Sequence, residues 1–257
     1  AKEVEIVARR HFYNTFVLNT DEKYEVEEQA IYSALSKKVD GIILCPTQRK
    51  IEAIKLLKKN GIPFVLWGRY FEEEPETDYV VCNDFKGGYL ATQHLIERGH
   101  RDILCLTGPS YISSARERLA GYKKALKGQG IGYCPELIRE TSVTSGECRR
   151  VIKKALEEKV KFTAIFAFSD MIAWEAIYTL NKQGIRVPHD VGVIGFDNIQ
   201  SRMYFPFPLT SVSPSKKKMS RRAVNILLKK MNNPEPDQYF HEVIDPGIVI
   251  RESTSRG

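Results

Sequence analysis

The sequence predicts an α/β fold built from two halves of similar construction. Apolar runs of strand length alternate with runs of helical periodicity along almost the whole chain, which is typical of parallel sheets covered by helices. The segments "LLKKNGIPFVLWGR" and "TLNKQGIRVPHDVGVIGFDN" repeat one plan of helix, glycine, isoleucine, strand and polar end. The length of 257 residues also suits two α/β domains.

The elements of the first half follow from the spacing of apolar residues. Between Glu25 and Lys37 these residues recur at helical spacing, whereas Gly41–Cys45 is a short continuous apolar run typical of a buried strand. The same patterns predict, in order, strand Tyr13–Asn19, helix Glu25–Lys37, strand Gly41–Cys45, helix Ile51–Lys58, strand Phe64–Leu66, strand Tyr79–Cys82 and helix Phe85–Arg98. Gly61 fits the left-handed residue that closes a helix.

The second half repeats the alternation and ends in a different tail. The predicted order is strand Ile103–Thr107, helix Ser114–Lys127, strand Leu137–Thr141, helix Ser145–Glu157, strand Ala164–Phe166, helix Ser169–Asn181 and strand Val191–Gly195. After Pro208 we expect one short strand and one helix, and then the strands Phe240–Ile244 and Ile248–Arg251. No low-complexity stretch or long linker divides the chain.

Charge, hydrophobicity and cysteine content limit the classes of protein to which this chain can belong. The formal charge of +7 is spread over 257 residues, so it indicates a nucleic-acid partner only weakly. No apolar run approaches the about 20 residues that span a bilayer, and the first residues do not resemble a secretory signal. The five cysteines form no CxxC pair. Because they are odd in number and lie mostly in apolar stretches, we expect reduced thiols and a cytoplasmic protein.

Sequence signatures of catalysis are missing. There is no GxSxG, HExxH, GxxxxGK[ST] or strand-linked GxGxxG motif, and the five histidines are scattered without metal-ligand spacing. No carboxylate pair or nucleophile–base arrangement stands out. The basic segment "SKKKMSRRAVNILLKKM" carries an apolar stripe, so we expect a helix with a solvated face rather than a DNA-binding element. We therefore expect no catalytic residue, metal site or cofactor, and not an enzyme.

Charged residues at strand ends are the candidate binding groups. Asp197 follows the strand in "VIGFDN", and Arg69 holds the corresponding place in the first half. Ligands of open α/β sheets bind beyond the carboxyl ends of the strands. A lone Asp197 suits an acceptor for ligand hydroxyls, although an Asx turn is the alternative. Arg116 and Arg118 point to different faces of one helix, so one of them can reach a crevice unless both are surface residues.

Eight segments together resemble one family, and they cover nearly the whole chain. They are "YNTFVLNTDE", "KKVDGIILCPT", "NGIPFVLWGR", "VCNDFKGGYLATQHLIERGHRDILCLTGP", "SARERLAGYKKAL", "FAFSDMIAWEAIYTLNKQGIRVPHDVGVIGFDN", "PLTSVSPSKKKMSRRAVNILL" and the ending "VIRESTS". In this order they resemble the effector-binding core of the lac repressor/galactose repressor (LacI/GalR) family of bacterial transcription regulators.

The resemblance implies two Rossmann-like parallel-sheet subdomains joined by three crossovers, as in type I periplasmic binding proteins, with ligand in the cleft. It puts residues 1–98 and 216–243 in the N-terminal subdomain, and residues 99–215 and 244–257 in the C-terminal one. It also implies that the family's first strand and its helix-turn-helix DNA-binding head are not in this chain.

The resemblance further implies a set of ligand-binding residues. Arg118 matches the cleft arginine of the family's "R-x-R-L-A-G" motif, and Asp197 matches its cleft aspartate. Arg69 aligns with a ligand-contacting arginine of related sugar-binding proteins. Ser169 falls where several relatives place an asparagine that hydrogen-bonds the ligand. Asp84 belongs to the family's Asp-Asn pair, which is reversed here as Asn83-Asp84.

Several positions depart from the family pattern. Thr141 lies where sugar-binding relatives often place an aromatic residue that stacks on the ligand. Trp67 could take over that role, or it could face the core. Pro214 replaces a frequent glutamine, and Gly68 replaces an acidic residue. The predicted ligand-binding set is Arg69, Asp84, Arg118, Thr141, Ser169, Asp197 and Trp67.

The function that the resemblance implies is the effector-binding and dimerisation core of a transcription regulator. A small polar effector, foremost a sugar or sugar derivative, would control binding of operator DNA by a cytoplasmic homodimer. The alternative is an exported periplasmic-type sugar-binding protein of a transporter, against which the cysteines and the "RESTS" ending argue. Upstream residues would discriminate the two. The sequence leaves open the effector, the operator, the choice between induction and co-repression, and the choice between dimer and tetramer.

Overall fold

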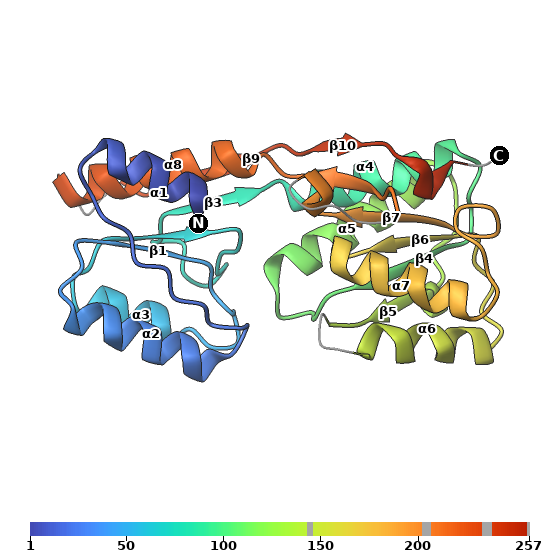
Figure 1. The fold of residues 1–257 in the computed structure, drawn as a ribbon, viewed down its shortest axis with the longest axis horizontal. Coiled ribbons are helices and arrows are strands. Elements are labelled where there is room, and N and C mark those ends of the chain that lie inside the picture. The colour runs from blue at the N-terminus through green and yellow to red at the C-terminus, as the bar shows by residue number, and fades with distance from the viewer. Residues whose placement is uncertain (143–145, 202–206, 233–237, 256–257) are drawn as a thin grey trace. The chain divides into compact units, whose positions relative to one another are not determined.

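The computed structural model describes residues 1–142, 146–201, 207–232 and 238–255, and the chain folds into two units (Figure 1). Unit 1 comprises Ala1–Cys82, Tyr111–Ser113 and Ser215–Ile244, and unit 2 comprises Asn83–Ser110, Ser114–Pro214 and Asp245–Gly257. The family resemblance placed residues 83–98 in the first subdomain, whereas their contacts in the structure group them with unit 2. The reason is that these residues form a helix that packs on the sheet of unit 2.

Unit 1 is built on a four-stranded parallel sheet with the strand order β1-β2-β3-β9. The strands are β1 (Ile42–Leu44), β2 (Phe64–Trp67), β3 (Tyr79–Cys82) and β9 (His241–Ile244), and the helices are α1 (Lys2–Arg10), α2 (Tyr24–Ser36), α3 (Glu52–Lys59) and α8 (Lys216–Asn232). Helices α1 and α8 cover one face of this sheet, and α2 and α3 cover the other (Figure 1). The predicted helices and strands from Glu25 to Cys82 are confirmed within one residue or so.

The helices of unit 1 bury the apolar faces that the sequence pattern indicated. On α3, Ile54 and Leu57 are fully buried against Leu66 of β2. Burying such a side chain stabilises a fold by about 1.5–3 kcal/mol. On α8 the apolar stripe with Met219, Ala223 and Ile226 is buried, while the lysines of its first turn are mostly exposed. The basic segment therefore forms a helix with one buried and one solvated face, as expected.

The predicted strand Tyr13–Asn19 is wrong. This run lies between α1 and α2 outside any strand, and the side chains of Phe16 and Val17 are 74% and 70% exposed. A strand needs a neighbour that takes up its backbone hydrogen bonds. Among the described strands, β1 stands at the edge of the sheet and pairs with β2 alone. The apolar character of the run predicted a strand, but pairing is a tertiary property that the local pattern does not contain.

Unit 2 is built on a six-stranded sheet with the order β10-β8-β7-β6-β4-β5. Its strands run parallel except for the antiparallel pair of β10 and β8. The strands are β4 (Ile103–Thr107), β5 (Ile138–Glu140), β6 (Ala164–Ala167), β7 (Gly192–Phe196), β8 (Thr210–Ser213) and β10 (Gly247–Val249). The helices are α4 (Asp84–Glu97), α5 (Ser113–Gly128), α6 (Glu147–Glu157) and α7 (Asp170–Lys182), with short 3-10 turns at Pro135–Leu137, Ile199–Ser201 and Glu252–Thr254.

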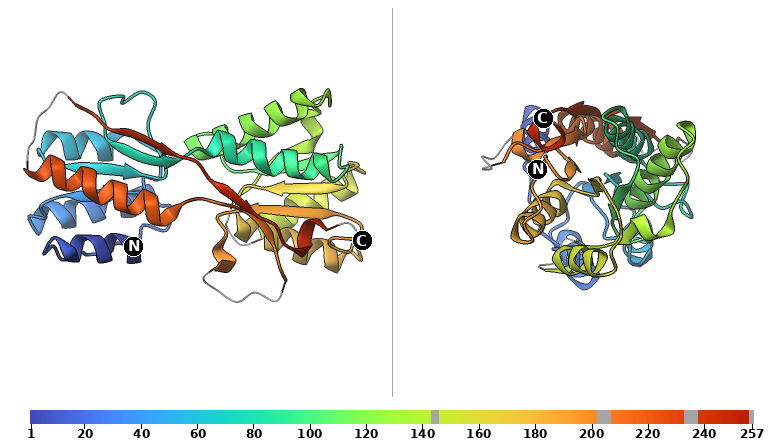
Figure 2. Two further views of the ribbon diagram at one scale, coloured as in Figure 1. Left: turned by 90° about the horizontal axis from the view of Figure 1, so that it is seen from above. Right: turned by 90° about the vertical axis from the view of Figure 1, so that its right-hand side faces the viewer.

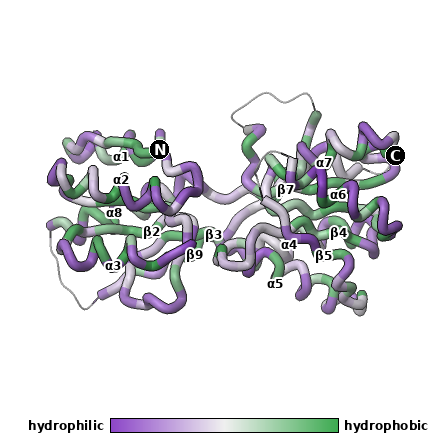
Figure 3. The backbone as a smooth tube through the Cα atoms, turned by 90° about the horizontal axis from the view of Figure 1, so that it is seen from below, coloured by the Kyte–Doolittle hydropathy of each residue, from purple (hydrophilic) through white to green (hydrophobic). Residues whose placement is uncertain are grey.

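The predicted elements of the second half are confirmed, with shifts of one or two residues at their ends. The helix expected from Ser145 begins at Glu147, because Gly146 is its N-cap with a φ of 85°; Ser145 itself lies outside the described residues. The mainly buried strands of this unit carry its most hydrophobic segments, and the loops around them are more hydrophilic (Figure 3). Both sheets therefore have the sandwiched character that the sequence alternation predicted.

Strand β7 shows how the two faces of this sheet are covered. A Cβ built on Gly87 of α4 would lie 2.5 Å from Cε2 of Phe196, so α4 packs directly on that side of β7. A Cβ built on Gly195 would lie 2.3 Å from Oδ1 of Asp170, the first residue of α7. Because adjacent strand residues point to opposite faces, α4 and α7 cover opposite faces of the sheet (Figure 2).

Helices α4 and α5 touch backbone to backbone. A Cβ on Gly88 would lie 2.1 Å from the carbonyl oxygen of Arg118, and a Cβ on Gly121 would lie 2.1 Å from the carbonyl oxygen of Phe85. Only the hydrogen atom of glycine fits at such a distance. Glycine inside a helix is unfavourable by about 1 kcal/mol relative to alanine, so close packing explains its presence here. The contact sets Arg118 of α5 beside the start of α4.

Candidate functional site

A buried ion pair lies where α4 begins. Arg118 Nε donates a hydrogen bond to Asp84 Oδ1 at 2.7 Å, and Arg118 Nη1 donates to the backbone carbonyl of Phe168 at 2.6 Å. The side chains of Arg118 and Asp84 are only 11% and 3% exposed. Two directed bonds from one rigid guanidinium hold this group in a single orientation.

Two aromatic rings enclose the guanidinium. Its central carbon lies 3.5 Å from the ring centroid of Phe196 and 4.7 Å from that of Phe168. Both distances are within the about 6 Å at which a cation is attracted to an aromatic face. Phe196 ends β7, and Phe168 directly follows β6. The sheet therefore presents the arginine at the carboxyl ends of two neighbouring strands, where ligands of α/β folds bind.

The pKa of Asp84 is raised above the ordinary value of a carboxyl group. Burial raises the pKa of Asp84 to about 6, although the guanidinium of Arg118 acts to lower it. The carboxylates of Glu117 and Asp197 also raise this pKa. Asp84 is therefore mostly ionised at neutral pH, and it takes up a proton in mildly acidic solution.

This pKa predicts a pH dependence of stability. Because the folded pKa of about 6 exceeds the ordinary value of 3.8, the folded protein binds this proton more tightly than the unfolded chain does. The contribution of Asp84 to stability is thus fully present below the ordinary pKa of 3.8 and is lost as the pH rises through the folded pKa. We expect the free energy of unfolding of wild type, minus that of Asp84→Asn, to fall between about pH 4 and about pH 7. Urea unfolding measures this difference, and a pH-independent difference would contradict the assignment.

Asp197 and Ser169 lie next to the residues that hold Arg118. Asp197 follows Phe196 directly and has a φ of 106°, in the region that favours glycine. Its backbone N–H donates to the carbonyl of Val212 at 2.8 Å. Ser169 follows Phe168 and caps α7, where its Oγ accepts from the N–H of Ile172 at 3.4 Å. The structure thus brings four of the predicted residues, Asp84, Arg118, Ser169 and Asp197, to one end of the sheet of unit 2; we call them the charged cluster.

Thr141 also belongs to unit 2, just beyond β5. The residue is 2% exposed, and its backbone N–H donates to the carbonyl of Thr107 at 2.9 Å. The aromatic platform that relatives often place here is therefore replaced by a small buried residue. The rings of Phe168 and Phe196, which the sequence interpretation did not single out, are aromatic groups that lie against the guanidinium of Arg118. Their positions after β6 and at the end of β7 are the signal that could have revealed them.

Arg69 and Trp67 are the predicted residues of unit 1. Arg69 Nη1 and Nη2 donate to the two carboxylate oxygens of Glu22 at 2.7 and 2.8 Å, and Nη1 also donates to the carbonyl of Pro46 at 2.9 Å. The indole nitrogen of Trp67 is buried without a hydrogen-bond partner among the described residues. Sequence reasoning missed Glu22, because 47 residues separate it from Arg69.

A buried glutamate orders the loop that follows β1. Glu27 accepts from the backbone N–H of Thr47 at 2.7 Å, and burial raises the pKa of Glu27 although the bonds from Thr47 lower it. Gln48, which follows Thr47, accepts from the N–H of Ser113 at 2.9 Å and donates to the carbonyl of Tyr70 at 2.6 Å. The polar loops around Arg69 are therefore internally bonded within unit 1.

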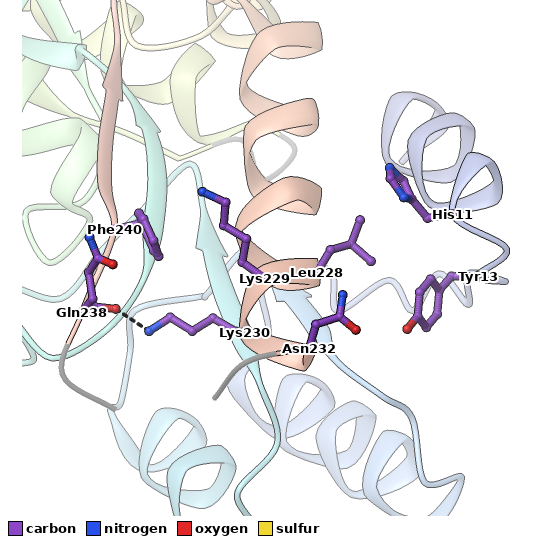
Figure 4. Close-up of a pocket in the computed structure, with 8 residues that line it drawn as sticks. All are labelled: His11, Tyr13, Leu228, Lys229, Lys230, Asn232, Gln238 and Phe240. Atoms are coloured by element: carbon purple, nitrogen blue, oxygen red, sulfur yellow. Dashed lines mark hydrogen bonds between the residues drawn. The ribbon is translucent and has the colours of Figure 1, made fainter. Parts of the chain in front are cut away.

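A pocket of about 620 Å³ opens elsewhere on unit 1 (Figure 4). Its lining residues are His11, Tyr13, Leu228, Lys229, Lys230, Asn232, Gln238 and Phe240. None of them belongs to the predicted set. The ammonium of Lys230 is engaged by the carbonyl of Gln238 and lies 3.4 Å from a carboxylate oxygen of Asp78. We assign no role to this pocket.

Two further properties concern the described part of the chain. None of its helices combines the length and the apolar character that crossing a bilayer requires. It also contains no group of three or more histidine, cysteine, aspartate or glutamate side chains that could hold a metal ion.

Comparison with known proteins gives a consistent result. A family model for the periplasmic binding protein-like domain matches residues 92–254. The HTH-type transcriptional repressor PurR of Aliivibrio fischeri is 34% identical over an alignment that covers 98% of this chain and 75% of that protein.

Solved structures of regulators share the fold. The transcriptional regulator CelR in complex with cellobiose superposes with a TM-score of 0.89 at 29% identity, covering 98% of this chain and 76% of that one. The transcription regulator CcpA of Lactococcus lactis superposes with a TM-score of 0.88 at 26% identity, covering 99% of this chain and 92% of that one.

Proposed function

Because this chain belongs to the LacI/GalR family of transcription regulators, as its effector-binding core, we propose that its charged cluster binds the small polar effector of the regulator. Its relatives are transcriptional repressors, which favours a regulator over an exported solute-binding protein. The single observation that carries the proposal is the buried pair of Arg118 and Asp84, in which the guanidinium of Arg118 lies against the rings of Phe168 and Phe196.

The chemistry of the charged cluster favours a neutral, hydroxyl-rich effector. Asp84 neutralises Arg118, so the pair provides donors and acceptors without a net charge. Asp197 adds an acceptor for ligand hydroxyls, and the carboxylates of Asp84 and Asp197 oppose an anionic ligand. The rings of Phe168 and Phe196 supply apolar surface of the kind found in small-molecule sites. That CelR was solved with cellobiose supports a sugar or sugar derivative as the class.

We propose the remaining parts of the regulator from the family as well. The partners would be operator DNA, bound through a helix-turn-helix head of the kind named for the PurR relative, and a second copy in a cytoplasmic homodimer. Arg69, Trp67 and Thr141 would contribute further ligand contacts. An effector can change operator affinity only as far as it binds one conformation more tightly than another. We expect no turnover of the bound molecule.

A thermal-shift screen tests the proposal. The intact protein is incubated with neutral sugars, sugar phosphates and nucleobases, because a ligand at 100 times its Kd stabilises the folded state by about 2.7 kcal/mol. We expect neutral sugars to raise Tm and sugar phosphates to be weaker. A response to sugar phosphates alone would contradict the neutral class.

The Asp197→Ala variant then tests the site. We expect the sugar that raises Tm most to bind at least about tenfold more weakly, since a lost charge-assisted bond costs about 1.5–3 kcal/mol. Calorimetric titration gives the affinity, and unfolding without sugar shows whether the fold is kept. Asp190→Ala is the control, because Asp190 is paired with Arg186 on the surface. Equal affinities of the two variants would reject the site.

A further inference from the structure

The loop that carries Asp197 has an unusual backbone. Asp197 and Asn198 are consecutive non-glycine residues with φ values of 106° and 47°. The φ of Asp197 lies well beyond the left-handed helical region near +57°. Residues with a side chain rarely adopt such a φ. Such a conformation persists only where the surrounding structure imposes it. The contacts of this loop should therefore reveal what imposes it.

Each backbone N–H of the loop has a defined acceptor. The N–H of Asp197 donates to the carbonyl of Val212 at 2.8 Å, and the N–H of Asn198 donates to Ser211 Oγ at 3.0 Å. The N–H of Ile199 donates to Asp170 Oδ2 at 2.7 Å. Two of these three acceptors are side-chain atoms. The conformation of the loop therefore depends on the identity of the residues around it and not only on strand pairing.

Asp170 and Ser211 act together. Ser211 Oγ donates to Asp170 Oδ1 at 2.6 Å, so Asp170 receives one bond from the loop directly and reaches Asn198 through Ser211. Both residues are fully buried. The carboxylate fits because residue 195 is a glycine, whose missing Cβ would lie 2.3 Å from Asp170 Oδ1.

The side chain of Asn198 is held from the C-terminal segment. Asn198 Oδ1 accepts from Arg251 Nη2 at 2.7 Å, and Asn198 Nδ2 donates to Ser213 Oγ at 3.0 Å. Arg251 Nη1 donates to the carbonyl of Leu209 at 2.6 Å, which anchors the arginine beside β8. A residue 53 positions away in the sequence therefore restrains the residue next to Asp197.

We propose that Asp170, Ser211 and Arg251 are positioning residues that hold the Asp197 carboxylate in its place for the effector. They act through the backbone of Asp197 and Asn198 and do not contact the effector themselves. This inference rests on the proposed function, because it assigns Asp197 a ligand. The inference adds three residues, from α7, β8 and the C-terminal segment, that determine how tightly the charged cluster binds the effector.

The chain offers a matched pair of variants. Ser211→Ala removes a buried hydroxyl that bonds the loop. Ser253→Ala removes an equally buried hydroxyl that donates to the carbonyl of Val193 at 2.6 Å and accepts from the N–H of Thr210 at 2.8 Å. Neither partner of Ser253 lies in the loop. Arg251→Met is the second test variant, and it keeps the experiment informative if Ser211→Ala fails to fold.

Amide hydrogen exchange of the intact protein is the first readout. We expect the amides of Asn198 and Ile199 to exchange at least about tenfold faster in Ser211→Ala and in Arg251→Met than in Ser253→Ala, while the amides of Val193 and Ile194 in β7 stay protected in the two test variants. If Ser211 and Arg251 only stabilised the fold in general, the variants would raise amide exchange throughout β7. Unchanged exchange at Asn198 and Ile199 would overturn the inference.

Calorimetric titration with cellobiose and with the neutral sugars of the screen is the second readout. We expect Ser211→Ala to weaken binding at least about tenfold in the wild-type background and to have no further effect in the Asp197→Ala background, as a double-mutant cycle requires of residues that act through one another. If Asp197→Ala weakens binding but Ser211→Ala and Arg251→Met do not, the inference fails while the proposed function stands. If Asp197→Ala leaves binding unchanged, the proposed function fails, and the exchange result alone decides whether these residues hold the loop.

Discussion

Replacing Arg118 with methionine is expected to lower the free energy of unfolding at neutral pH by about 3–5 kcal/mol, the cost of leaving a buried partner charge uncompensated. The side chain of Asp84 is only 3% exposed, and in this variant it lacks the guanidinium that acts to lower its pKa. The substitution also removes the hydrogen bond from Arg118 to the carbonyl of Phe168 and the contacts of the guanidinium with the two phenylalanine rings. Methionine keeps much of the apolar contact, so the loss reports mainly on the charge.

The pH dependence separates this cause from simple loss of packing. Without Arg118 the pKa of Asp84 should rise above its present value of about 6. The destabilisation should therefore be largest at neutral pH and should shrink as acid neutralises Asp84. Urea unfolding at neutral and at mildly acidic pH measures both effects. Adding Asp84→Asn to the Arg118→Met variant should recover part of the loss at neutral pH.

Arg186→Met is the matched control. Arg186 makes three hydrogen bonds to Asp190, but the pair lies on the surface, where ion pairs contribute little. We expect little change in stability and no dependence on the titration of Asp84. If Arg118→Met behaved like Arg186→Met, the pair of Arg118 and Asp84 would not be the organising contact of the charged cluster.

Gly121→Ala is expected to destabilise unit 2 by about 1–3 kcal/mol, the common cost of overpacking a tight contact. The added Cβ would lie 2.1 Å from the carbonyl oxygen of Phe85 and 2.6 Å from the backbone N of Tyr89. Both neighbours are backbone atoms, so the two helices must separate. That movement shifts α5, and with it Arg118, relative to Asp84 on α4.

Gly128→Ala is the control in the same helix. No heavy atom lies within 4 Å of a Cβ built there. The substitution should be neutral or stabilising by up to about 1 kcal/mol, because alanine favours a helix over glycine. Urea unfolding of both variants gives the comparison. Equal stability of Gly121→Ala and Gly128→Ala would show that the helices are not held at backbone contact.

The charged cluster could be predicted only in part. Arg118, Ser169 and Asp197 were found from the family resemblance and, for Asp197, from its place after a buried strand. Asp84 and Arg69 were also in the predicted set, but which residues they pair with could not be predicted. Asp84 lies 34 residues from Arg118, and Glu22 lies 47 residues from Arg69, so no local pattern links either pair. The grouping of Asp84 with unit 2 likewise depends on the packing of α4.

By itself, the sequence determined the α/β class, the order of the helices and strands from Glu25 onward, and the strand ends at which polar residues gather. It could do so because apolar spacing and helix-closing glycines act over a few residues. The tertiary structure decided that Tyr13–Asn19 forms no strand, that Arg118 is buried against Asp84, and that Asp170, Ser211 and Arg251 hold the Asp197 loop. These properties depend on pairing and burial between residues distant in the chain, and such contacts exist only after the chain has folded.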